Sequence, residues 1–65
     1  MKIDTIFKFN IGERVRLISH NVEGVVNGLW IVREGVFYYN VEYKNTDGHI
    51  EDRNFFESEI AELLT

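Results

Sequence analysis

Apolar and polar residues alternate along much of the chain, which indicates half-buried β-strands because successive side chains of a strand point to opposite faces. In residues 14–17 (Arg-Val-Arg-Leu), Val15 and Leu17 share one face and the two arginines share the other. This segment is therefore predicted to be a short strand, entered from a turn over residues 11–13.

A second, longer strand is predicted over Gly24–Arg33, which is rich in β-branched and aromatic residues. Gly28 in its middle indicates a bulge or a sharp bend. The segment His20–Gly24 interrupts the alternation, and Asn21 within it tolerates a positive φ angle. The pattern thus predicts a loop, followed by a strand that bends.

The clearest strand runs from Val36 to Tyr43, and its buried face is predicted to carry Phe37, Tyr39, Val41 and Tyr43. Asn45–Gly48 is a strong hairpin turn, because Asp-Gly supplies the backbone conformation that a tight turn requires. A fourth strand then returns over His49–Arg53, and Ile50 is expected to point inward.

Two interpretations are open for residues 55–64. Asn54 and Glu57 have the spacing of a capping box, and the apolar residues that follow fit the stripe of an amphipathic helix. The alternative is one helical turn over residues 55–58 and then a short closing strand over Ile60–Leu64. We favour the turn and strand, because a helix of this length needs tertiary support and because the strand completes the architecture described next.

The ordered elements resemble the Src-homology-3-like (SH3-like) small barrel, as in KOW-type and Tudor-type domains and in many small phage and bacterial accessory proteins. The resemblance rests on four motifs in order: Phe9–Arg16, Gly24–Val26, Tyr39–Tyr43 and Phe56–Ile60. It implies an all-β fold, a five-stranded SH3-like barrel with a short helical turn before the last strand. A single domain is expected over residues 1–65, with its core in 9–64. Because this fold hosts many functions, the resemblance alone names none.

Composition narrows the class of protein. The chain has 65 residues, of which 45% are hydrophobic and 28% charged, and this is typical of a folded domain rather than a disordered one. It contains no cysteine, which excludes disulfides, thiolate metal sites and cysteine nucleophiles. No apolar run reaches the ~20 residues of a membrane span, and Met1–Lys8 carries charges where a signal peptide is apolar. We therefore expect a cytoplasmic protein without a membrane partner.

The aromatic residues of the middle strands are the first candidate site. Tyr38 lies on the predicted exposed face, and Trp30 belongs to the neighbouring strand; both residue types are enriched in protein contacts. We predict a non-enzymatic binding module that uses Trp30 and Tyr38 as apolar anchors and Glu51 and Arg53 as a polar rim. Its partner would be another protein or a second copy of the chain.

A nucleic-acid-associated accessory domain is the first alternative. Arg14 and Arg16 share a strand face about 7 Å apart, a spacing that suits backbone phosphates, and Lys8 adds a third cation. The net charge of −4 argues against general affinity for nucleic acid. The charge is also uneven, because residues 42–65 hold two basic residues against seven acidic ones.

Enzymatic function is expected only in a second alternative. The chain is similar to the plasmid-type dihydrofolate reductase, a tetrameric barrel, in its Gly-acid-Arg-Val-Arg opening. At the place of that family's neutral pore residues it has Ile50-Glu51-Asp52-Arg53, whose carboxylates would repel the cofactor phosphates. His49 and Glu51 share a strand face but are too few ligands for a metal. We therefore predict no catalytic residue, cofactor or metal.

Overall fold

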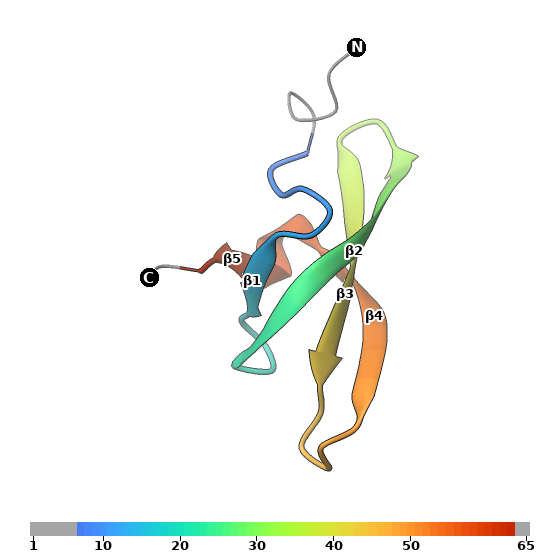
Figure 1. Ribbon diagram of the computed structural model, residues 1–65. Helices are drawn as coiled ribbons and strands as arrows, with labels where there is room; N and C mark the ends of the chain where they lie inside the picture. Colours follow the sequence, from blue (N-terminus) through green and yellow to red (C-terminus); the bar gives the residue numbers. More distant parts are fainter. Residues whose placement is uncertain (1–6, 64–65) are drawn as a thin grey trace.

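One antiparallel sheet of five strands forms the fold in the computed structural model, which describes residues 7–63 (Figure 1). The elements are β1 (Arg14–Leu17), β2 (Val22–Arg33), β3 (Val36–Lys44), β4 (Ile50–Phe56), the 3-10 helix η2 (Glu57–Glu59) and β5 (Ile60–Glu62). The all-β class, the five strands and the helical turn before the last strand are thus confirmed.

The sheet is open. Its strand order is β4-β3-β2-β1-β5, so within residues 7–63 the strands β4 and β5 lie at opposite edges and do not close a barrel. Only three residues form β5, and all of them pair with β1. The closed cylinder expected from the sequence is therefore not formed.

A bulge in β2 bends the sheet, as Gly28 predicted. The register with β3 slips between Val26 and Gly28, so that Asn27 is the extra residue. An inserted residue changes the phase of side-chain alternation. Val26 and Leu29 consequently point to the same face, and Trp30 points to the other.

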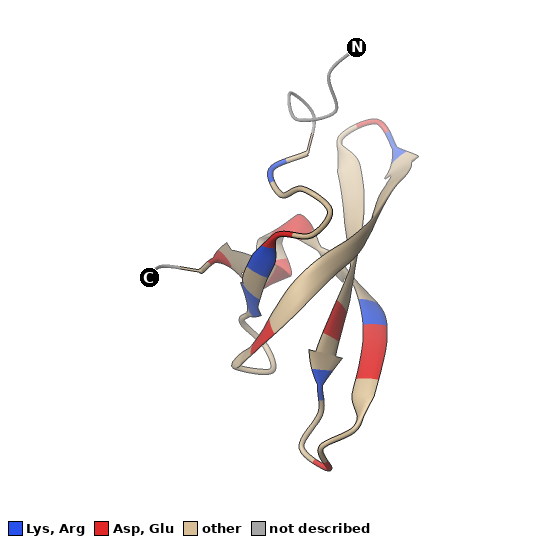
Figure 2. Ribbon diagram, viewed as in Figure 1, with Lys and Arg blue, Asp and Glu red and all other residues tan. Residues whose placement is uncertain are grey.

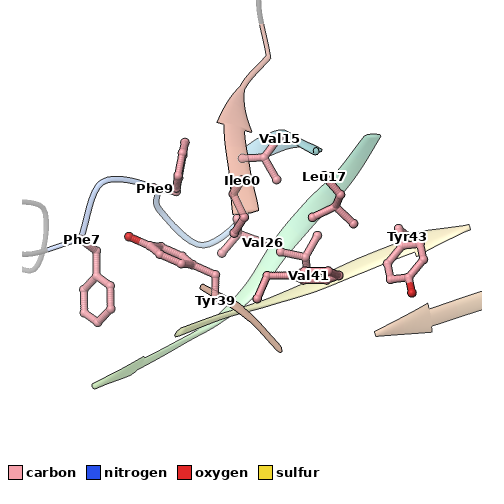
Figure 3. Packing of buried hydrophobic residues seen from close by; sticks show 10 residues of the cluster. Phe7, Phe9, Val15, Leu17, Val26, Tyr39, Val41, Tyr43 and Ile60 are labelled. Carbon is pink, nitrogen blue, oxygen red and sulfur yellow. The ribbon is translucent and has the colours of Figure 1, made fainter. Parts of the chain in front are cut away.

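The core lies on one face of the sheet, which we call the inner face; the opposite one is the outer face (Figure 3). The ring of Tyr39 lies between Phe7 and Phe9 with edge-on contacts, the centroids 5.8 and 5.4 Å apart. Its hydroxyl donates to Glu57 (2.6 Å) and accepts the backbone N–H of Lys8 (2.9 Å). Tyr39 thereby joins β3, η2 and the segment before β1. Phe7 extends the core beyond the predicted range of 9–64.

The prediction for Ile50 in the fourth strand is wrong, and the helical interpretation of the residues after that strand is ruled out. Ile50 does not point inward but is 61% exposed, because Phe55 is buried in the core and fixes the odd-numbered residues of β4 on the inner face. Asn54 does not cap a helix, because pairing with β3 extends β4 to Phe56.

The helical turn is displaced accordingly. Its amide cap is made by Glu59, whose carboxylate accepts the backbone N–H of Phe56 (2.7 Å). The turn occupies residues 57–59 rather than 55–58. The closing strand ends at Glu62; Leu63 follows it, and Leu64 lies outside the described residues. Residues 55–63 therefore form a turn and a strand, not one helix.

Candidate functional site

Three neighbouring strands carry aromatic side chains on the outer face. Trp30 of β2 lies opposite Tyr38 of β3, and Tyr38 lies opposite Phe56 of β4. The rings of Tyr38 and Phe56 are in contact, with centroids 4.5 Å apart. Trp30 is 54% exposed and Phe56 is 44% exposed, while Tyr38 between them is half-buried. We call these three residues the outer aromatic row.

The indole of Trp30 lies against the backbone at Gly28. A Cβ atom at position 28 would lie 3.5 Å from Nε1 of Trp30, an ordinary van der Waals contact, and 3.2 Å from Cβ of Asn40. The same glycine belongs to the bulge that turns Trp30 outward. Local sequence therefore sets both the direction of this side chain and its resting place. Trp30 is the only tryptophan of the chain.

Polar side chains continue the outer face along β3 and β4. Asn40 lies opposite Asn54 and donates a hydrogen bond from Nδ2 to Oδ1 (2.9 Å). Glu42 lies opposite Asp52 in the next outward-facing pair. Figure 2 shows a basic residue, Arg33, at the tip end of β2, and between it and this acidic pair β2 and β3 carry no charge. The outer face thus has an aromatic, an amide and an acidic zone.

An open groove of about 570 Å³ borders the outer aromatic row. It lies between the tip of the β2–β3 hairpin and η2, and its lining comprises Lys8, Gly35, Val36, Phe37, Phe56, Glu57, Ser58 and Ile60. Phe56 is shared by the groove and the row, whereas Phe37 and Ile60 line the groove from the inner face.

The predicted anchors and the predicted rim lie on different faces. Trp30 and Tyr38 are neighbours on the outer face, but Arg53 lies opposite the buried Val41 and is therefore on the inner face. Glu51 is on the inner face as well, opposite Tyr43. The four residues consequently do not make one surface.

Glu51 instead stabilises the β3–β4 hairpin. Its carboxylate accepts hydrogen bonds from Asn45 Nδ2 and Tyr43 Oη, both at 2.7 Å, and lies 3.2 Å from Nε of Arg53. The hydrogen bond from Asn45, together with those from Tyr43 and Arg53, lowers the pKa of Glu51. Asn45 Oδ1 in turn accepts the backbone N–H groups of Asp47 (2.9 Å) and His49 (3.0 Å), which confirms the predicted turn.

The basic residues of the first alternative are not gathered in one place. Arg14 and Arg16 share the outer face of β1, as predicted. Arg14 forms an ion pair with Glu23, and Arg16 donates to the side chain of Asn21. Lys8 lines the groove, with Nζ 5.4 Å from the Phe9 ring centroid. The two guanidinium groups are therefore already engaged within the protein.

Sequence reasoning missed Phe56 as a surface residue. The sequence assigned it to a helical turn, whereas the structure makes it the last residue of β4. The signal was the apolar pair Phe55-Phe56 at the end of an alternating segment, which places one ring on each face. Which of the two rings is exposed depends on which residues of β4 face the core.

Residues 7–63 contain no group of three His, Asp or Glu side chains arranged to hold a metal ion. Among the same residues, no helix has the length and apolarity needed to cross a membrane. Comparison of the chain with protein-family models, with curated proteins and with solved structures finds no match.

Proposed function

We propose that the protein is a non-enzymatic module that binds a protein partner through the outer aromatic row. The observation that carries this proposal is the alignment of Trp30, Tyr38 and Phe56 across three paired strands on a face that leaves two of the rings about half exposed. The resemblance to SH3-like barrels stays a prediction beside it.

Folding alone does not account for these three rings. The core lies on the inner face and does not include these rings. The exposed part of each ring therefore adds little to the stability of the fold, but its burial against a partner would be favourable. Contiguous apolar surface on a small domain marks an interaction site, and tryptophan and tyrosine dominate the energetics of such contacts.

The row is formed by the fold itself, before any partner binds. Its residues stand on hydrogen-bonded strands rather than loops, and Tyr38 and Phe56 hold each other in place. Binding to a preformed surface loses less conformational entropy than binding that must order it. Asn40 and Asn54 provide adjacent amide groups that give such a contact direction.

The experiment compares two faces of the same hairpin. The double variant Trp30→Thr with Phe56→Thr removes the row, and threonine preserves strand propensity. Ile31→Thr is the matched control, because Ile31 adjoins Trp30, is 56% exposed and lies opposite Phe37 on the inner face. Each protein is immobilised and used for affinity capture from a lysate. Proteins retained by the wild type and the control should be lost with the double variant.

Retention of the same proteins by the double variant would contradict the proposal, as would the absence of any captured protein. The two alternatives give different results. A gel shift with nucleic acid at low salt that disappears in Arg14→Gln with Arg16→Gln would support the accessory-domain alternative. A tetramer in sedimentation that binds a nicotinamide cofactor would support the reductase-like one.

A further inference from the structure

The acidic zone of the outer face is unfavourable for the isolated protein. Glu42 and Asp52 lie directly opposite each other on β3 and β4, and like charges in that relation destabilise a sheet. Lys44 is on the same face, yet neither carboxylate forms an ion pair within the described part of the chain. The repulsion between the two carboxylates is therefore not offset by an ion pair within the described residues.

The acidic pair has a fixed position relative to the aromatic row. Glu42 is four residues from Tyr38 along β3, and Asp52 is four residues from Phe56 along β4. At ~3.3 Å per residue this is a separation of about 13 Å. The hydrogen-bonded pair of Asn40 and Asn54 lies midway. One ligand that follows the strands would therefore contact all three zones.

We infer that the segment docking on the outer face is a basic peptide segment, which places a lysine or arginine against Glu42 and Asp52 and an apolar side chain on the outer aromatic row. This inference rests on the proposed function and specifies the chemistry of the partner. A cation in this position relieves the repulsion between the two carboxylates, so binding and charge complementarity act together.

Other occupants match this face less well. The phosphates of a nucleic acid would meet the two carboxylates and be repelled. A second copy of the chain would offer Arg14 and Arg16, which are already bonded to Glu23 and Asn21, and Lys44, which lies beside an acidic pair of its own. A separate basic segment is the occupant that satisfies both zones.

The test starts from a phage-displayed library of random linear peptides of about 12 residues, long enough in extended form to span the ~13 Å between the zones. Peptides selected on the wild-type protein are synthesised and titrated, with the fluorescence of Trp30 as the reporter, since it is the only tryptophan. The variant Glu42→Gln with Asp52→Asn removes the acidic pair. Glu34→Gln with Asp47→Asn is the control, because it changes the net charge equally at two exposed turn positions.

The expected result is enrichment of lysine and arginine among the selected peptides. Loss of two exposed ion pairs should weaken peptide binding about five-fold in the acidic-pair variant, while the control binds as the wild type does. The difference should shrink as salt is added, because exposed charge pairs are screened. Thermal unfolding of the acidic-pair variant should occur at the same temperature or higher, since a repulsion has been removed.

Two outcomes separate the inference from the proposed function. In the first outcome, the peptides lose binding to Trp30→Thr with Phe56→Thr but bind the acidic-pair variant with unchanged affinity. This outcome would overturn the inference and leave the proposed function in place. Peptides indifferent to the row, or no enrichment at all, would overturn both. Concentration-dependent association of the free protein in sedimentation, lost in the row variant, would show that the occupant is a second copy instead.

Discussion

Two rows of large side chains run across the same three strands, back to back. The inner row consists of Leu29, Tyr39 and Phe55, and the outer aromatic row consists of the residues next to them in sequence: Trp30, Tyr38 and Phe56. Tyr39 and Phe55 are buried, whereas Trp30 and Phe56 are about half exposed. The residue types hardly differ between the rows; what differs is the side of the pleat on which each side chain stands.

The comparison shows how a chain of this size divides its aromatic residues between stability and recognition. The inner row is covered by the segment before β1 and by η2, through Phe7, Phe9 and Glu57. No described segment covers the outer row to the same extent. Substitutions in the inner row should therefore lower the stability, whereas those in the outer row should mainly weaken binding. This can be tested in order of decreasing effect.

The largest difference is expected between Phe55→Ala and Phe56→Ala. Removing a buried phenylalanine costs about 3–5 kcal/mol, which approaches the whole stability of about 5 kcal/mol of a marginally stable small domain. Phe56→Ala should cost about 1 kcal/mol, because the ring is 44% exposed and contacts Tyr38. Urea unfolding followed by circular dichroism measures both. Equal costs would mean that the two faces have been assigned incorrectly.

The pair Tyr39→Phe and Tyr38→Phe isolates the hydroxyl groups. Tyr39 donates to the Glu57 carboxylate, and the loss of a hydrogen bond to a charged group costs about 1.5 kcal/mol. Tyr38 has no such bond within residues 7–63, so its variant should be as stable as the wild type. A stable Tyr39→Phe protein would show that the bond to Glu57 contributes nothing to folding.

Alkaline titration separates the tyrosines in a second way. Burial and the hydrogen bond to Glu57 raise the pKa of Tyr39 to about 12, and the hydrogen bond to Glu51 raises the pKa of Tyr43. A raised pKa contributes stability that is present below pH ~10 and is lost as the pH rises through the folded-state value. Unfolding should therefore begin between pH 10 and about 12, and the absorbance of the phenolate form should rise over the same pH range. In Tyr39→Phe, less stability should be lost over this pH range.

The smallest effect distinguishes the acids of the two faces. The pKa of Glu51 is lowered by its hydrogen bonds from Asn45 and Tyr43 and by Arg53, so its contribution is present above the unfolded-state pKa of ~4.3 and is lost as the pH falls below it. Glu51→Gln should flatten the acid side of the stability profile and lower the stability at neutral pH. Glu42→Gln should not lower the stability at neutral pH, because Glu42 forms no ion pair within residues 7–63 and its removal relieves the repulsion from Asp52. An equal loss of stability in both variants would contradict the distinction.

Alternation along the chain was enough to predict most of the fold. Residues 14–17 form the strand expected, the long second strand contains the expected bulge, and the buried face of β3 includes Tyr39 and Val41 as predicted. β1 and residues 39–43 of β3 carry apolar residues at every second position, so their own sequence determines which face is buried. The long second strand was predicted from its β-branched and aromatic residues instead.

The phase of β4 could not be obtained in the same way. Its first four residues contain one apolar side chain, Ile50, and that residue was expected inside. The phase is instead set at the far end of the strand, where Phe55 packs opposite Tyr39. The same shift places Glu51 and Arg53 on the inner face and Phe56 on the outer one. The contact between Phe55 and Tyr39, which are far apart in the sequence, therefore determines which residues of β4 face the core.

Part of the candidate site was therefore predictable. Trp30 and Tyr38 were identified from residue type and from the exposed face of β3, although the bulge hides the phase of Trp30 in the sequence. Phe56 and Asp52 depend on the register of β4, which only the folded sheet defines.

Because the two rows share the same three strands, binding of a partner to the outer row should also stabilise the folded chain. The partner contacts all three strands and binds only when those strands are paired. A ligand at 100 times its dissociation constant adds ~2.7 kcal/mol to the free energy of unfolding. Backbone amides beneath the core would then exchange more slowly with solvent, and the unoccupied molecules would be the first that a protease removes.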